Sequence, residues 1–140
     1  MSKAAILIAD GCEECEALIQ VDMLRRAGID IDMVSITGNR QVTSARDITF
    51  ICDRVLSDFD ADAYDAVILP GGMPGTKHLR DDSGVISVVK KYAAAGKLVA
   101  AICAAPTVLG FAGVLKGKNA TCYPGMEDGL TGAQDRKSVV

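Results

Sequence analysis

Aromatic side chains, histidine and excess basic charge are all scarce in this chain of 140 residues, and each shortage excludes a class of protein. Tryptophan is absent and aromatic residues make up only 4% of the sequence, which argues against a platform that stacks nucleic-acid bases. Fifteen basic residues against eighteen acidic ones give a net charge of −3, which excludes a nucleic-acid binder that works through bulk positive charge. The single histidine, His78, is expected at the surface, and the sequence shows no Cys–His–Asp arrangement.

A long hydrophobic run is also missing. The best candidate is the uncharged segment 98–115, whose 18 residues just reach the length of a membrane-spanning helix. It contains five alanines, two glycines and Pro106, so a strand followed by a helix is the better interpretation. The apolar stretch within residues 1–9 is too short for a signal peptide. We therefore expect no membrane segment and no targeting signal.

The five cysteines are an odd number in a chain that is long enough to build its own core. This usage is typical of free thiols in a reducing compartment and not of a secreted disulfide framework. The sequence therefore predicts a cytoplasmic protein.

Hydrophobic residues make up 49% and charged residues 24%, as in a soluble globular protein, and the length fits a single domain over residues 1–140. Three short apolar runs, 4–9, 66–69 and 98–102, have the length and continuity of parallel strands buried on both faces. Residues 29–36 predict a further strand.

Helical patterns lie between these strands. The first pattern ends at Gly28 and the second at Gly96, where each glycine is placed to cap a helix. Their apolar faces comprise Ala17, Leu18, Val21, Leu24 and Ala27, and then Val85, Ile86, Val89, Tyr92 and Ala93. A third helix is expected after Cys103, with Pro106 in its first turn. The alternation predicts an α/β fold with a doubly wound, mostly parallel sheet, helices on both faces and sites at the carboxyl ends of the strands.

Two segments are less regular. Residues 41–44 and 48–52 predict a small hairpin-like excursion around the turn at Gly38–Asn39. After a polar, turn-rich stretch, residues 138–140 look like the beginning of another strand.

The turn at residues 9–14 lacks the G-x-G-x-x-G pattern and has acidic residues where a phosphate would lie, so we expect no nucleotide cofactor. Cys12 and Cys15 form a C-x-x-C motif at this junction, where redox motifs also occur. The charges of the intervening Glu13 and Glu14 oppose thiolate formation, and no second cysteine pair completes a zinc site. We expect no metal, and disulfide exchange through these two thiols stays an alternative.

Cys103 is the strongest candidate for a catalytic residue. It follows a predicted strand and precedes a predicted helix, which is the position of a nucleophile held exposed at a sharp strand-to-helix turn. The helix N-terminus should lower the pKa of the thiol from its free value of about 8.5. The alternative is that Cys103 is a small buried hydrophobic residue, as free cysteines often are.

Two further turns are expected at the same edge. Gly71 and Gly72 follow the second apolar run, and their backbone N–H groups are candidates for an oxyanion hole. Glu16 follows the first run, and a carboxyl group beside a thiol is suited to acid/base work. For Glu13 and Glu14 the simpler interpretation is that they complement the dipole of the first helix.

Three sequences in this order are specific together: G-C-E-E-C-E at 11–16, L-P-G-G at 69–72 and A-A-I-C-A-A-P at 100–106. They resemble the ThiJ/PfpI family from Lys3 to about Gly125. The resemblance implies a flavodoxin-like fold of the class I glutamine amidotransferase type, a homodimer and no cofactor.

By this resemblance Cys103 is an oxidation-sensitive nucleophile and Glu16 is its protonated carboxyl partner. The backbones of Gly71, Gly72 and Ala104 would line the oxyanion side. The resemblance also implies that Arg26 and Arg46 lie near the site and the dimer interface, and that Cys52 is an interface thiol.

The chain departs from the family at two site positions. Ala104 stands where protease-like members have a histidine, so peptidase activity is not expected. Tyr123, also site-adjacent, stands where some members have a histidine, which removes one proton-transfer group. The family continues with a strand, a turn near the site and a closing helix, so we expect that the given chain is C-terminally incomplete.

The resemblance implies a cofactor-free cysteine enzyme that converts small dicarbonyls such as methylglyoxal into hydroxy acids, or that repairs early glycation adducts. In this scheme Cys103 attacks the aldehyde and Glu16 transfers the proton. The alternative is a non-enzymatic sensor of oxidative stress, or a redox-regulated chaperone, in which oxidation of Cys103 changes partner interactions. Substitution of Glu16 by Gln separates the two, because turnover needs its proton transfer and thiol oxidation does not.

Overall fold

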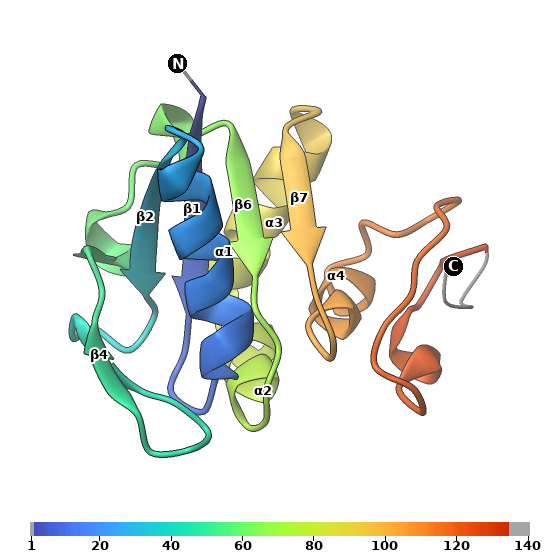
Figure 1. The fold of residues 1–140 in the computed structure, drawn as a ribbon. Helices are drawn as coiled ribbons and strands as arrows, with labels where there is room; N and C mark the ends of the chain where they lie inside the picture. Colours follow the sequence, from blue (N-terminus) through green and yellow to red (C-terminus); the bar gives the residue numbers. More distant parts are fainter. Residues whose placement is uncertain (1, 135–140) are drawn as a thin grey trace.

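The computed structural model describes residues 2–134, which form a parallel sheet between two layers of helices (Figure 1). Its strand order is β5-β2-β1-β6-β7, and every neighbouring pair in it is parallel. The strands are β1 (Lys3–Ile8), β2 (Asp30–Ser35), β5 (Arg54–Val55), β6 (Ala66–Leu69) and β7 (Leu98–Ala101). The α/β fold with a mostly parallel sheet is therefore confirmed. The predicted strand at 138–140 lies outside the described residues.

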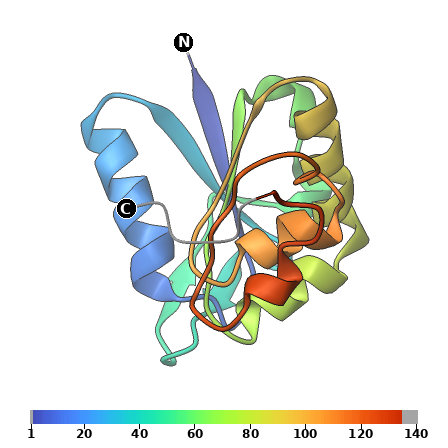
Figure 2. The same cartoon turned by 90° about the vertical axis from the view of Figure 1, so that its right-hand side faces the viewer.

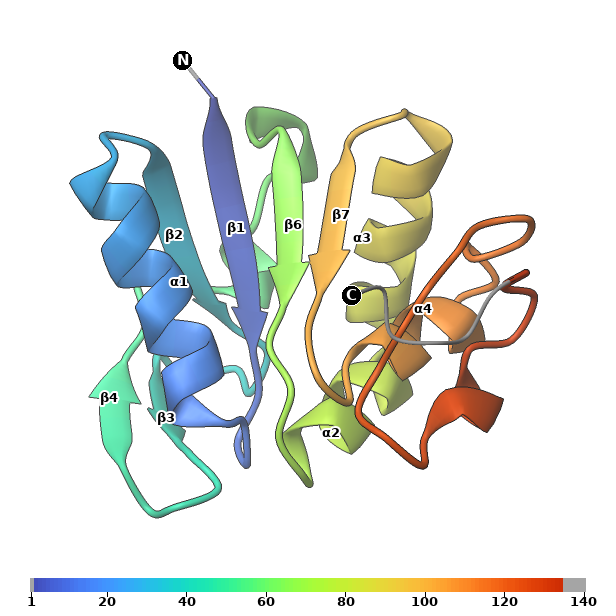
Figure 3. The ribbon, with the colours of Figure 1, turned by 45° about the vertical axis from the view of Figure 1, so that its right-hand side comes forward.

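Helices cover both faces of the sheet. The helix α1 (Glu14–Arg26) packs on one face, whereas α2 (Gly75–Asp81), α3 (Ser83–Ala94) and α4 (Pro106–Phe111) lie on the other (Figure 3). The predicted helix ends are confirmed, because α1 is followed by Gly28 and α3 by Gly96, both at positive φ. Pro106 begins α4, where its missing N–H costs nothing. Short 3₁₀ turns occupy Leu56–Asp58, Ala61–Ala63 and Glu127–Gly129.

The strand β1 explains why both faces need covering. Its residues alternate between two cores, with Ala5 and Leu7 facing α3 and α4, and Ile6 and Ile8 facing α1. All four side chains are fully buried, as the continuous apolar run predicted. In the sheet register Ile6 lies beside Met33 of β2 on one side and Ile68 of β6 on the other.

The strand β7 does not have this environment. Leu98 is 64% exposed, and the other three residues of β7 are only half-buried. The prediction that this run is buried on both faces is wrong, because β7 is the last strand in the order that the described residues form and α1 lies over the other half of the sheet. An apolar groove of about 440 Å³ results, with Ile19 and Met23 of α1 along one side and Leu98 and Ala100 along the other.

The hairpin differs from its prediction in one respect. The strands β3 (Gln41–Thr43) and β4 (Thr49–Ile51) pair antiparallel, but the turn between them spans residues 44–48 and is closed by the Ser44 N–H on the Ile48 carbonyl at 2.9 Å. The Gly38–Asn39 turn instead joins β2 to β3. Asp47 at φ 60° supplies the tight turn, which a glycine was expected to do.

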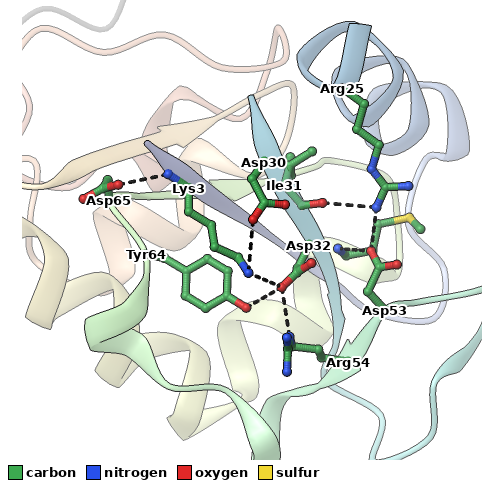
Figure 4. Close-up of polar contacts among 10 residues, drawn as sticks. Lys3, Arg25, Asp30, Ile31, Asp32, Asp53, Arg54, Tyr64 and Asp65 are labelled. Atoms are coloured by element: carbon green, nitrogen blue, oxygen red, sulfur yellow. Dashed lines mark hydrogen bonds and ion pairs between the residues drawn. The ribbon is translucent and has the colours of Figure 1, made fainter. Parts of the chain in front are cut away.

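An ion-pair network closes the amino-terminal edge of the sheet (Figure 4). The Asp32 carboxylate of β2 accepts from the Tyr64 hydroxyl at 2.5 Å and from the Arg54 Nε at 2.9 Å, and it pairs with the Lys3 Nζ at 3.1 Å. These contacts connect β1, β2 and β5 with the segment that enters β6. They lie at the edge opposite the carboxyl ends of the strands, so the network supports the sheet and not the site.

Candidate functional site

The carboxyl ends of β1, β6 and β7 bring the three predicted turns to the same edge (Figure 3) of a sheet that has α1 on one side and the other helices on the opposite side (Figure 2). The centre is the turn after β7, where Cys103 has φ 62°. This left-handed conformation is strained for a residue other than glycine, and it is typical of a nucleophile on a strand-to-helix elbow. Cys103 is half-buried, which excludes the alternative of a fully buried core residue.

Gly71 lies between the other two predicted groups. A Cβ at this position would come within 2.5 Å of Glu16 Oε2 and 2.8 Å of Cys103 Cβ. Cys103 and Glu16 therefore both lie close to Gly71, although 87 positions separate the two residues along the chain. A larger residue at 71 would separate the thiol from the carboxyl group.

Glu16 is fixed by the backbone of this turn. Its Oε2 accepts the Gly71 N–H at 2.8 Å, and its own N–H is donated to Glu13 Oε2 at 2.7 Å. Because the Gly71 N–H is already used, the expectation that it lines an oxyanion hole is wrong. Its backbone donor holds the acid/base candidate instead.

Two other backbone donors lie beside the Cys103 sulfur. The backbone N–H groups of Gly72 and Ala104 interact with the Cys103 sulfur and favour its charged form. Gly72 can present its N–H because it has φ 93°, a conformation that an L side chain would strain. The structure thus brings the Gly72 and Ala104 N–H groups to the sulfur and the Gly71 N–H to Glu16. An oxyanion role for Gly72 and Ala104 stays a prediction.

The pKa of Cys103 is raised, and the expectation of a lowered pKa is wrong. The largest cause is burial, and the second is the hydrogen bond and negative charge of Glu16. The N–H groups of Gly72 and Ala104 act in the opposite direction but do not outweigh these effects. The surroundings of Cys103 therefore favour its thiol form over its thiolate.

Of the remaining residues predicted to be near the site, Tyr123 and Arg46 lie on segments bonded to its turns, whereas Arg26 lies away from it. The backbone N–H of Tyr123 donates to the Cys103 carbonyl at 2.7 Å, while its side chain is 56% exposed. Arg46 lies on the turn between β3 and β4, which the Ala45 N–H ties to the Cys12 carbonyl at 2.8 Å. Arg26 lies at the far end of α1, about 15 Å along the helix axis from Glu16. It pairs with Asp22 at 2.9 Å, so one chain alone does not bring it to the site.

Two of the other thiols, Cys12 and Cys52, are buried. Burial raises the pKa of Cys12 to about 11 and that of Cys52 to about 12. A buried thiol with a high pKa is a poor redox partner for the exposed Cys15, so the structure does not support disulfide exchange through the C-x-x-C motif.

No group of three or more histidine, cysteine, aspartate or glutamate side chains within residues 2–134 is arranged to hold a metal ion. His78 is exposed, as predicted, with its Nδ1 at 2.8 Å from the Asp10 carbonyl. In the same part of the chain no helix is long and apolar enough to cross a membrane.

Sequence reasoning missed the part played by Glu13 and the one played by the backbone of residue 123. The sequence suggests only that Glu13 complements the helix dipole, but in the structure its carboxylate caps α1 by accepting the Glu16 N–H. The signal was available, since Glu13 stands three positions before Glu16 at a predicted helix start. The contact of Tyr123 with Cys103 has no local signal, because the two residues are far apart along the chain.

The family is decided by a match that spans almost the whole chain: the model of the DJ-1/PfpI family matches residues 2–139. The chain belongs to the DJ-1/PfpI family. Protein dj-1beta of Drosophila melanogaster is 41% identical over 144 residues, covering 100% of this chain and 77% of that relative. A protein of Pyrococcus abyssi named a deglycase is 31% identical, over 94% of this chain and 78% of that relative.

Solved structures of DJ-1 proteins have the same fold. The structure named Toxoplasma gondii DJ-1, oxidized, superposes with a TM-score of 0.92 at 34% identity, covering 99% of this chain and 76% of that one. The resemblance predicted from the three turn sequences is thereby confirmed, together with the flavodoxin-like fold that it implied.

Proposed function

We propose that this DJ-1/PfpI protein is a cofactor-free enzyme that acts on small reactive dicarbonyls, with Cys103 as nucleophile and Glu16 as acid/base. The observation that supports it is the elbow conformation of Cys103, whose half-buried thiol lies among the Glu16 carboxyl and the N–H groups of Gly72 and Ala104. A relative named a deglycase supports the same class of activity.

The first step is addition of the Cys103 sulfur to the aldehyde carbon of the dicarbonyl. A carbon–sulfur bond forms, the thiol proton passes to the Glu16 carboxylate, and the carbonyl oxygen takes the electron pair of its broken π bond. The N–H groups of Gly72 and Ala104 are the donors that would stabilise this oxygen. A resting thiol with a raised pKa suits this step, because Glu16 can remove the proton as the bond forms.

The second step is proton transfer within the hemithioacetal. Glu16 first returns the thiol proton to the adduct's oxygen, which gives the neutral hemithioacetal and a free carboxylate. The carboxylate then removes the proton from the former aldehyde carbon and delivers it to the neighbouring carbonyl carbon. The hydroxyl proton of the first carbon moves to the oxygen of the second, and the product is a thioester of a 2-hydroxy acid. Water then hydrolyses the thioester and restores the Cys103 thiol. The net reaction adds one water to the dicarbonyl, so that one carbon is oxidised and its neighbour reduced without an external electron carrier.

The test is lactate formation from methylglyoxal by the purified chain. Turnover is expected in the parent protein, and loss of at least a hundredfold in Cys103→Ser and Glu16→Gln, because each removes one half of the proton-coupled addition. Cys15→Ser is the matched control, since that thiol is exposed and outside the site. Lactate formation that persists in Cys103→Ser would contradict the proposal.

The second candidate is a sensor in which hydrogen peroxide oxidises Cys103 and the product alters partner binding. It is favoured by the partial exposure of Cys103 and by a related structure named as oxidized. Glu16→Gln distinguishes the two functions, because peroxide oxidation of Cys103 should survive in a variant that has lost turnover.

We also propose that the chain works as a homodimer through α1 and the β3–β4 turn. Glu14 is only 8% exposed, yet its Oε2 has no hydrogen-bond partner within the described residues. It borders an apolar groove of about 410 Å³, with Ile19 and Ile48 at its rim. Arg46 lies on the β3–β4 turn. Its guanidinium donates to the Ala45 carbonyl and to no carboxylate in the described part of the chain. A second copy would supply the missing cation.

Five free cysteines support a reducing compartment, and we propose the cytoplasm.

A further inference from the structure

Glu13 lies beside Glu16, whose backbone N–H donates to the Glu13 carboxylate. It forms the N-cap of α1, and both its backbone and its carboxylate are engaged with residues of the site. Capping alone would need only the carboxylate, so the second contact indicates that Glu13 does more than begin a helix.

Three hydrogen bonds connect Glu13, Glu16 and Gly71 in a closed ring. The Glu13 N–H donates to the Gly71 carbonyl at 2.9 Å, the Gly71 N–H donates to Glu16 Oε2 at 2.8 Å, and the Glu16 N–H donates to Glu13 Oε2 at 2.7 Å. Each residue both donates and accepts. The position of the Glu16 carboxyl is therefore determined from its backbone and from its side chain at once.

The ring also reaches the oxyanion side. A Cβ on Gly72 would come within 2.6 Å of the Cys12 carbonyl carbon, so the Gly72 turn packs directly on the Cys12–Glu13 backbone. Gly72 is one of the two N–H donors to the Cys103 sulfur. A displacement of Glu13 would thus move the acid/base group and one of the donors together.

We propose that Glu13 is a positioning residue that holds the Glu16 carboxyl against Cys103, through the acceptor oxygen of its side chain and not through its charge. The inference rests on the proposed pairing of Cys103 with Glu16, and it does not depend on the identity of the substrate. A simple complement to the helix dipole would act through charge, and this difference can be measured.

The experiment measures the alkylation rate of Cys103 by iodoacetamide from pH 6 to pH 11, read by mass spectrometry of its peptide. Because Glu16 raises the pKa of Cys103, a misplaced Glu16 should lower the midpoint of this profile. Glu13→Ala is expected to lower it by about half a unit or more, towards the value of Glu16→Gln. Glu13→Gln is expected to keep the parent midpoint, because its amide oxygen still accepts the Glu16 N–H.

The control for lost capping is Asp82→Ala. Asp82 caps α3 in the same way, with its carboxylate accepting the Val85 N–H at 2.9 Å, and it lies on a different helix from Glu16. It should lower the melting temperature about as much as Glu13→Ala and leave the Cys103 midpoint unchanged.

Two results would overturn the inference while leaving the pairing of Cys103 with Glu16 intact. One is a parent-like midpoint in Glu13→Ala while Glu16→Gln shifts it, which would make Glu13 a cap only. The other is an equal shift in Glu13→Gln and Glu13→Ala, which would assign the effect to charge. An unchanged midpoint in Glu16→Gln would refute the pairing itself and the inference with it. Failure of dicarbonyl turnover alone would affect only the substrate, since alkylation does not require it.

Discussion

The thiol of Cys103 shows how opposing local effects combine at a single residue. Two backbone N–H groups favour the thiolate, as expected at a strand-to-helix turn, but burial and the neighbouring Glu16 carboxyl favour the thiol more. The helix that follows has only six residues, so it offers a short macrodipole. Reactivity at Cys103 therefore depends on a proton acceptor and not on a permanently ionised sulfur.

Four of the five thiols should react with iodoacetamide in an order set by burial. At pH 8 we expect Cys15 and Cys103 to be alkylated and Cys12 and Cys52 to be protected, because burial raises the pKa of the latter two to about 11 and about 12. Peptide mapping by mass spectrometry under native conditions measures this directly. Faster labelling of Cys12 than of Cys103 would contradict this prediction and support the alternative of disulfide exchange through the C-x-x-C motif.

Gly71 is a second residue where one atom decides the outcome. Gly71→Ala should reduce turnover at least tenfold, because the new Cβ would meet Glu16 Oε2 at 2.5 Å and Cys103 Cβ at 2.8 Å. The comparison is Gly96→Ala, where the alanine has positive φ but meets no atom within 4 Å. That variant should lose some stability and keep its activity. Equal turnover in the two variants would contradict the contact described here.

At the scale of elements, the two edges of the sheet have different roles. The ion-pair network at the amino-terminal edge stabilises the fold, and the candidate site lies at the carboxyl-terminal edge. The Asp32 carboxylate accepts a hydrogen bond from a tyrosine and forms ion pairs with an arginine and a lysine, each from a different segment (Figure 4). The two edges lie at opposite ends of the same strands, so a change at one should leave the other intact.

Asp32→Asn tests this division. The three donors hold the pKa of Asp32 at about 2 against the cost of burial, well below its ordinary value. A lowered pKa in the folded state adds stability above about pH 4, and this stability is lost as the pH falls towards 2. We expect the variant to lose about 2 kcal/mol of unfolding free energy at pH 7 and little at pH 2. Urea unfolding at both pH values measures it, and an equal loss at both would exclude the ionic explanation.

The elements that the sequence predicted well are those with local signals. The boundaries of α1 and α3 follow from apolar periodicity and a capping glycine, and β1 follows from an unbroken apolar run. The β3–β4 turn was misplaced because Asp47 adopts the left-handed conformation that Gly38–Asn39 signalled more strongly. The same apolar run that predicted a buried strand at β7 could not reveal that this strand lies at the edge of the described sheet.

At the scale of the whole molecule, the two faces of α1 have different surroundings. Towards the sheet, Ala17 and Val21 are buried, whereas Ile19 and Met23 are more than half exposed. Exposed apolar side chains beside an unpartnered buried carboxylate are typical of a surface that another protein covers.

The dimer proposal is tested by light scattering coupled to size-exclusion chromatography. We expect the parent protein to have twice the mass of one chain, and Arg46→Glu to be monomeric, because it places a second negative charge near Glu14. Arg80→Glu is the control, since Arg80 lies on α2, away from this surface. A monomeric parent protein, or a dimeric Arg46→Glu variant, would contradict the proposal.

The sequence by itself determined most strands and helices along the chain, with β5 and α2 as exceptions, together with the class of fold and the three turns that meet at the site. These features follow from local periodicity, turn chemistry and the rule that parallel strands end at one edge. Only the tertiary structure decided that Gly71 holds Glu16 and does not serve an oxyanion, that the pKa of Cys103 is raised, and that Arg26 lies far from the thiol within one chain. Each of these depends on burial or on contacts between residues distant in sequence, which no local pattern encodes.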